Sequence, residues 1–117
     1  MDLDGLAPAE TAGNEMIYTS GTTGNPKGAV LTHKNLVHDA QNIINIWEIT
    51  SRDVLCHALP LFHIHGLCFA LHTTLLSGAH VRMLDQFDPD VVLTELSRQS
   101  GSGVCSVFMA VPAMYTK

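Results

Sequence analysis

Basic residues are scarce in this chain: it has six Lys and Arg among 117 residues and a formal net charge of −5 at pH 7. They are scattered and form no patch, which excludes the basic surface that nucleic-acid or anionic-membrane partners need. Cysteine is equally sparse. Cys56, Cys68 and Cys105 are an odd number without a C-x-x-C pair, which argues against a disulfide framework or a zinc ribbon. We therefore expect an intracellular, reducing compartment, the cytoplasm by default, with a mitochondrial or other organellar location left open.

Long hydrophobic runs are also missing. The longest, 67–76, contains His72, Thr73 and Thr74, and it is far shorter than the roughly 20 residues that cross a bilayer. No transmembrane segment is expected. Residues 1–15 carry four acidic and no basic residues, unlike a secretory signal or a mitochondrial presequence. We interpret 1–15 as an acidic leader or linker and place the folded part at 16–117.

The apolar and charged fractions, 46% and 15%, are typical of a globular domain with a core. Apolar segments alternate between strand-like and helix-like patterns along the chain. Strands are expected at 16–18, 29–31, 53–59, 80–84 and 104–111, and helices from 32 onward, over 67–76 and from 88 onward. This alternation predicts an α/β fold, part of a doubly wound, mostly parallel sheet with flanking helices.

Two of the predicted helices have clear start signals. Thr32 is a good N-cap, and Asp88 is another, with Pro89 at the first helical position. The apolar residues that we expect to face the core are Leu36, Val37, Ala40, Ile43, Ile44 and Trp47 in the first helix, and Val91, Val92 and Leu96 in the second.

The run from Tyr18 to Gly28 reads Tyr-Thr-Ser-Gly-Thr-Thr-Gly-Asn-Pro-Lys-Gly and joins two predicted strands. Its glycines let backbone N–H groups turn toward an anion, and its hydroxyls and Lys27 add further donors and a positive charge. These groups suit the phosphates of a nucleotide. The run is not a Walker A loop, because Lys27 lies between Pro26 and Gly28 and is not followed by Ser or Thr. The alternative is an ordinary Gly/Ser/Thr surface loop.

The Tyr18–Gly28 run resembles the signature loop of the adenylate-forming (AMP-binding) superfamily, which includes acyl-CoA synthetases, luciferases and nonribosomal peptide adenylation domains. Two further segments agree. Residues 59–66, Leu-Pro-Leu-Phe-His-Ile-His-Gly, resemble the next loop of acyl-CoA synthetases, and residues 107–117 are similar to the segment before the family's acyl-pocket residues. The likeness is greatest to malonyl-CoA synthetases and covers the chain from about residue 16 to its end.

The resemblance implies an ATP-dependent acyl-CoA synthetase. In that family a carboxylate attacks the α-phosphate of ATP, and the thiol of CoA then displaces AMP from the acyl-adenylate. The implied partners are ATP, Mg²⁺, CoA and a small carboxylic acid, with malonate or methylmalonate favoured; the oligomeric state stays open. Two alternatives remain: a synthetase for another acid, such as oxalate, a fatty acid or an aryl acid, and a non-catalytic fragment or weak nucleotide-binding module.

The resemblance also implies roles for individual residues. By this resemblance, the residues that bind the ATP phosphates are Thr19, Ser20, Gly21, Thr22, Thr23, Gly24 and Lys27. His63 takes a position beside the substrate carboxylate and the acyl pocket, and His65 is a weaker candidate for the same pocket. A strand would place both imidazoles on one side, which is a metal-ligand spacing, but no third ligand follows at a telling distance. Arg82 is a speculative partner for the second carboxylate of malonate, with a solvent-exposed strand-end arginine as the alternative.

Several family motifs are absent from these 117 residues. The chain has no Tyr-Gly-x-Thr-Glu, which supplies the magnesium-binding glutamate, and no Thr-Gly-Asp, which holds the ribose. The hinge and the mobile C-terminal domain with the catalytic lysine are absent too. We therefore expect a partial AMP-binding domain that does not catalyse the reaction alone. Because its strand edges would lie exposed, we also expect poor solubility in isolation.

Overall fold

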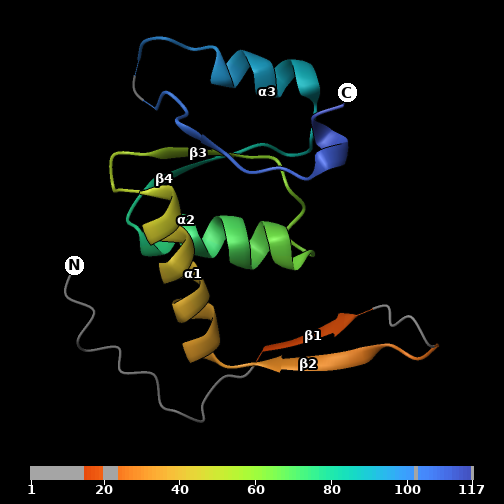
Figure 1. Cartoon of the computed structure of the whole chain (residues 1–117). Helices are drawn as coiled ribbons and strands as arrows, with labels where there is room; N and C mark the ends of the chain where they lie inside the picture. The colour runs from red at the N-terminus through yellow and green to blue at the C-terminus, as the bar shows by residue number, and fades with distance from the viewer. Residues whose placement is uncertain (1–14, 20–23, 102, 117) are drawn as a thin grey trace. The chain divides into compact units, whose positions relative to one another are not determined.

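The computed structural model describes residues 15–19, 24–101 and 103–116 of the chain (Figure 1). The chain divides into two compact units, 1–39 and 40–117. The division falls inside helix α1 (His33–Trp47). The domain boundary expected after residue 15 stays a prediction.

The N-terminal unit contains an antiparallel pair of strands, β1 (Glu15–Thr19) and β2 (Lys27–Leu31). Both strands were expected on either side of the glycine-rich run. Helix α1 then begins after Thr32, whose Oγ1 accepts a hydrogen bond from the Asn35 N–H at 3.2 Å. Asn35 Oδ1 in turn accepts from the Thr32 N–H at 3.1 Å. This reciprocal cap confirms the predicted helix start.

The C-terminal unit is built on a parallel sheet of three strands in the order β4-β3-β5. The strands are β3 (Val54–His57), β4 (His80–Met83) and β5 (Val107–Phe108). Every residue of β3 is buried, because the strand has a neighbour on each edge and is covered on both faces. The parallel sheet with flanking helices confirms the predicted α/β class.

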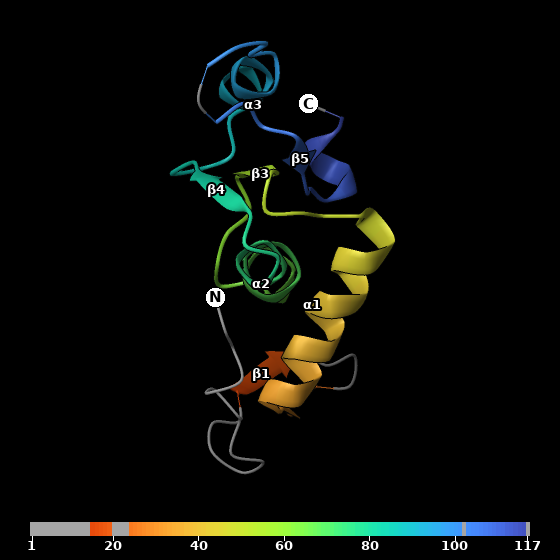
Figure 2. The same cartoon turned by 90° about the vertical axis from the view of Figure 1, so that its left-hand side faces the viewer.

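Helices cover the two faces of this sheet, as Figures 1 and 2 show. The connection from β3 to β4 runs through η1 (His65–His72), a π-helix, and α2 (Thr73–Leu76) on one face. The connection from β4 to β5 runs through α3 (Pro89–Leu96) on the other. The predicted cap of α3 is confirmed, since the Asp88 carboxylate accepts hydrogen bonds from the N–H groups of Asp90 and Val91 at 2.9 and 3.2 Å.

The side chains of β3 alternate between two hydrophobic clusters, as the period of a strand requires. Leu55 joins the larger cluster, which lies on the face of η1. Val54 and Cys56 join a smaller one on the face of α3. The buried members of the larger cluster are Ile43, Ile49, Leu55, Leu59, Ala70, Ala79 and Met109.

Asp53 connects the amino ends of the three strands. Its carboxylate accepts hydrogen bonds from the N–H and the hydroxyl of Thr50 at 2.7 and 2.9 Å, and from the Ser106 hydroxyl at 2.8 Å. The Ser106 hydroxyl oxygen accepts from the Val54 N–H at 3.0 Å, and the Asp53 carbonyl accepts from the His80 N–H at 3.0 Å. One residue thus links the starts of all three strands.

Some predicted boundaries were wrong. Strand β5 has two residues instead of the eight expected at 104–111, and Pro112 begins a 3₁₀ helix, η2 (Pro112–Met114). Val91 is 45% exposed, whereas its neighbour Val92 is buried. Val37 and Trp47 are also exposed at 45% and 47%, so the apolar stripe of α1 is only partly covered by the described residues. No helix among those residues has the length and apolar character needed to cross a membrane.

The Asp53 network predicts an acid-sensitive contribution to stability. The N–H of Thr50, followed by the hydroxyls of Ser106 and Thr50, lowers the pKa of Asp53 below its ordinary value of 3.8. A carboxyl group with a lowered folded pKa stabilises the fold above its unfolded pKa, and this contribution is lost as the pH falls below about 3.8. Because these hydrogen bonds are exposed to solvent, Asp53→Ala should cost about 0.5–1.5 kcal/mol at neutral pH.

Urea unfolding of the intact protein at pH 7 and below pH 4 measures this effect. Asp85→Asn is the matched control, because Asp85 is exposed and lies outside the network. The difference between Asp53→Ala and the unchanged protein should shrink at the lower pH. An equal difference at both values would contradict the assignment.

Candidate active site

The carboxyl ends of β3 and β4 form a topological switch point. The chain leaves β3 toward η1 on one face of the sheet and leaves the adjacent β4 toward α3 on the other (Figure 2). In open α/β sheets, ligands bind outside the carboxyl ends of strands at such a point. His57 and Met83 are the paired final residues of the two strands. We therefore expect a ligand at this edge.

The segment after β3 leads directly from the core to this edge. Ala58 and Leu59 are 4% and 7% exposed, so the chain stays packed beyond the end of the strand. It then turns at Pro60, whose carbonyl accepts a hydrogen bond from the His63 N–H at 3.3 Å. A Cβ on Gly66 would lie 2.4 Å from the Pro60 carbonyl oxygen, so only glycine fits at this close approach. The turn is thus held at both of its ends.

His63 lies exposed on this turn, and its ring centroid is 4.6 Å from that of Phe62, a side chain that is 85% exposed. The His63 carbonyl accepts hydrogen bonds from the N–H groups of Gly66 and Leu67 at 3.1 and 3.0 Å. An aromatic ring and an imidazole are therefore presented together at the switch point. The role of His63 beside a carboxylate stays a prediction.

His65 has a different environment from His63. It begins η1, and its ring stacks on Phe69 with centroids 4.7 Å apart and an interplanar angle of 10°. The expected loop over 60–66 is shorter, and the strand-like geometry considered for the His63–His65 pair was wrong, because the chain turns into a helix between them. Among the described residues, no group of three or more His, Cys, Asp or Glu side chains could hold a metal ion.

His57 is a buried polar residue of the core. It is 1% exposed and ends the central strand. Neither ring nitrogen has a hydrogen-bond partner among the described residues. Burial lowers the pKa of His57 below its ordinary value of 6.5, so the imidazole is neutral at physiological pH. In the sequence, His57 stands out only as the polar residue that follows the apolar run Val54–Cys56.

The candidate phosphate-binding residues belong to the N-terminal unit. Thr19 and Lys27 are opposite each other in the register of β1 and β2, so the antiparallel pair closes the base of the loop. Gly24 has a φ of 113°, which favours glycine. Ser20, Gly21, Thr22 and Thr23 lie outside the described residues. The phosphate-binding role of this set therefore stays a prediction.

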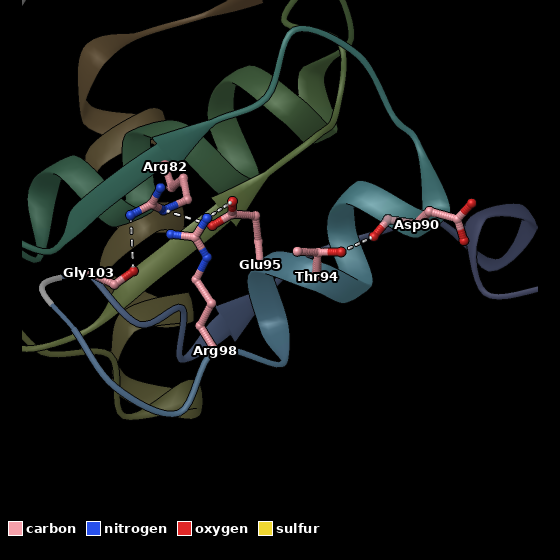
Figure 3. A network of polar contacts seen from close by, with 6 residues as sticks. All are labelled: Arg82, Asp90, Thr94, Glu95, Arg98 and Gly103. Carbon is pink, nitrogen blue, oxygen red and sulfur yellow. Dashed lines mark hydrogen bonds and ion pairs between the residues drawn. The ribbon is translucent and has the colours of Figure 1, made fainter.

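Arg82 has an acidic partner on the face of α3, as Figure 3 shows. Its Nε lies 3.2 Å from Glu95 Oε2, an ion pair without hydrogen-bond alignment, and its Nη2 donates to the Gly103 carbonyl at 3.4 Å. Arg98 Nη2 lies 3.0 Å from Glu95 Oε1. Glu95 thus pairs with both arginines, and the network joins α3 to β4. The role of Arg82 toward a second substrate carboxylate stays a prediction.

The three cysteines are buried and form no disulfide bond, which is typical of small core residues. Burial, followed by the neighbouring Cys105, raises the pKa of the Cys56 thiol to about 11. A thiol with such a pKa is almost fully protonated at neutral pH and is a poor nucleophile. Cys56 therefore belongs to the core and not to the chemistry.

Comparison with known proteins agrees with this arrangement. Residues 8–117 match the profile of the family described as AMP-binding enzyme. The mitochondrial malonate–CoA ligase ACSF3 of Homo sapiens is 44% identical over 105 residues, which are 90% of this chain and 18% of that protein. The chain thus spans about a fifth of the length of this relative.

Solved structures show the same fold. ATP-bound MatB from Rhodopseudomonas palustris has a TM-score of 0.76 and 42% identity, over 86% of this chain and 19% of that one. The o-succinylbenzoate coenzyme A synthetase MenE from Bacillus subtilis, in complex with AMP, has a TM-score of 0.75 and 36% identity, over 86% and 20%. With its family profile, its parallel sheet and its glycine-rich loop in agreement, the chain belongs to the AMP-binding enzyme family.

Proposed function

We propose that this chain is part of an AMP-forming acid–CoA ligase that acts on malonate or methylmalonate. The observation that carries the proposal is the Thr19–Lys27 run on its antiparallel base, in a chain that matches the AMP-binding family over 8–117. The choice of acid is supported by the similarity to the human malonate–CoA ligase and to bacterial MatB. The mitochondrial label of the human relative supports an organelle as an alternative to the cytoplasm.

The proposed reaction has two steps. A carboxylate oxygen of the acid attacks the α-phosphorus of ATP, the bond to the bridging oxygen breaks, and pyrophosphate leaves. The sulfur of CoA then attacks the acyl carbon of the adenylate, loses its proton, and AMP leaves. The first step increases the negative charge on the pyrophosphate, so donors around the β- and γ-phosphates lower the barrier.

The residues proposed for that stabilisation are those of the glycine-rich run. Backbone N–H groups and the hydroxyls of Thr19, Ser20, Thr22 and Thr23 would donate to phosphate oxygens, and Lys27 would supply a positive charge. Lys27 begins β2, so the strand fixes its backbone. Magnesium accompanies ATP in such reactions, but the described residues offer no ligand cluster for it. We assign no residue of this chain to the metal.

The alternative function is a ligase for another acid, and one observation supports it. The o-succinylbenzoate synthetase has nearly the same TM-score as MatB, so the shared fold does not select the acid. A chain without catalytic activity is the third possibility.

A substrate panel with the full-length ligase that carries this segment tests the choice of acid. We expect malonate or methylmalonate to give a kcat/KM for ATP–pyrophosphate exchange at least about tenfold above oxalate, a fatty acid and an aryl acid. A higher value for one of the other acids would replace malonate. Absence of exchange with every acid would favour the non-catalytic alternative.

Substitutions in the loop test the phosphate role. Lys27→Ala, and the pair Thr22→Ala with Thr23→Ala, should each slow ATP–pyrophosphate exchange by about 10- to 1,000-fold and raise the KM for MgATP, as loss of an oxyanion donor does. Lys34→Ala is the matched control, because Lys34 is exposed on α1 outside the loop. Unchanged exchange in both loop variants would remove the assignment.

His63→Ala tests the acid side of the site. The KM for the acid should rise by about tenfold or more while the KM for ATP changes by less than about twofold, because only the acid loses a contact. His80→Ala is the control, since His80 is exposed and begins β4 at the opposite edge of the sheet. Equal losses on the acid and ATP sides would instead indicate a role in folding.

A further inference from the structure

A glycine inside a strand is the least explained residue of the N-terminal unit. Gly28 is the second residue of β2, and its φ lies outside the left-handed region, unlike that of Gly24. Glycine weakens a strand because it loses more backbone entropy on folding and offers no side chain for packing across the pair. The backbone conformation therefore does not account for a glycine at this position, and its surroundings must.

Two side chains of β1 occupy the space beside Gly28. A Cβ added to Gly28 would lie 2.9 Å from Sδ and 3.0 Å from Cγ of Met16, and 3.4 Å from Cε1 of Tyr18. The register explains both contacts, since Tyr18 is directly opposite Gly28 and Met16 is its diagonal neighbour, opposite Val30. Met16 and Tyr18 thus take the place that a side chain at position 28 would fill.

The ring of Tyr18 compensates for the side chain that Gly28 lacks. Side chains directly opposite each other are the unit of stabilisation in an antiparallel pair, and an aromatic ring that packs over an opposing glycine restores part of the missing contact. Tyr18 is 67% exposed, so its ring gains little from burial in a core. Its contact with Gly28 therefore contributes mainly to the pairing of the two strands.

This contact lies next to the base of the candidate phosphate loop. In the hairpin of β1 and β2 (Figure 1), the pair that follows Tyr18–Gly28 is Thr19–Lys27, the pair nearest the loop. Because successive residues of a strand point to opposite faces, the side chain of Lys27 lies on the other face from the ring of Tyr18. The ring therefore acts on Lys27 through the backbone of the hairpin.

We propose that Tyr18 is a positioning residue whose ring, packed over Gly28, keeps Lys27 paired with Thr19 at the base of the phosphate loop. The proposal rests on the proposed function, because it connects that pairing to the binding of the ATP phosphates. The end of a hairpin frays when its last pairs lack side-chain contacts, and fraying would let the backbone of Lys27 move away from the phosphates. Tyr18 itself touches neither ATP nor the acid.

Variants of the full-length ligase that carries this segment test the proposal. Tyr18→Ala should raise the KM for MgATP in ATP–pyrophosphate exchange by about fivefold, the change that corresponds to loss of one strong cross-strand pair. The KM for the acid should change by less than about 1.5-fold, since the hairpin belongs to the phosphate side. Tyr18→Phe keeps the ring and loses only the hydroxyl, so its KM for MgATP should stay within about 1.5-fold of the unchanged enzyme's.

Val30→Ala is the matched control. Val30 is 54% exposed and pairs with Met16 on the same face, so the variant loses a cross-strand contact of the same kind two residues further from the loop. Its KM for MgATP should stay within about 1.5-fold. An equal rise in Val30→Ala would indicate a general loss of hairpin stability and would overturn the proposal. An equal rise in Tyr18→Phe would do the same, because it would assign the effect to the hydroxyl.

Lys27→Ala separates this inference from the proposed function. A raised KM for MgATP in Lys27→Ala beside an unchanged one in Tyr18→Ala would refute the positioning role alone. Crystal structures of Tyr18→Ala and Tyr18→Phe without nucleotide add a readout that does not depend on activity. Loss of the Thr19–Lys27 pairing in Tyr18→Ala only is the expected result, and retention of the pairing in Tyr18→Ala would contradict the proposal. If the pairing is lost but neither Tyr18→Ala nor Lys27→Ala changes the KM, the phosphate role of the loop fails and the positioning of Lys27 stands.

Discussion

Burial of β3 on both faces and along both edges is the constraint on which the C-terminal unit depends. A strand in that position can expose no side chain to water, so Val54, Leu55 and Cys56 must each face an apolar layer. The helices on either face supply those layers, and the Asp53 network aligns the strand starts. Polar contacts thus connect the amino ends of the strands, and we expect the ligand at their carboxyl ends.

That division explains where polar residues occur. At the amino edge, polar groups are paired, as the three hydrogen bonds to the Asp53 carboxylate show. At the carboxyl edge, His57 is buried without a partner among the described residues, and His63 is exposed on a tightly held turn. The unpaired ring nitrogens of His57 thus lie at the carboxyl end of the sheet, which is where α/β proteins bind ligands. The polar groups at the amino ends of the strands therefore differ in pairing from those at the carboxyl ends.

Local signals in the sequence were sufficient for much of the fold. The caps at Thr32 and Asp88 act within one helical turn, so both helix starts could be predicted from residue type alone. Features that depend on distant contacts could not. Strand β5 is short because only Val107 and Phe108 pair with β3, and nothing in its apolar run reveals that limit. Arg82 meets Glu95 across 13 positions of sequence, and His57 looked ordinary until the helix covering it was known. The roles given to single residues of the phosphate loop came from the family resemblance.

The central claim is that the Thr19–Lys27 run holds the phosphates of ATP. A crystal structure of the intact protein with bound ATP tests it most directly. The account predicts that the β- and γ-phosphate oxygens lie within hydrogen-bond distance of the loop N–H groups and hydroxyls and of Lys27 Nζ, above the base formed by β1 and β2. A triphosphate bound elsewhere, with the loop and Lys27 facing solvent, would contradict it.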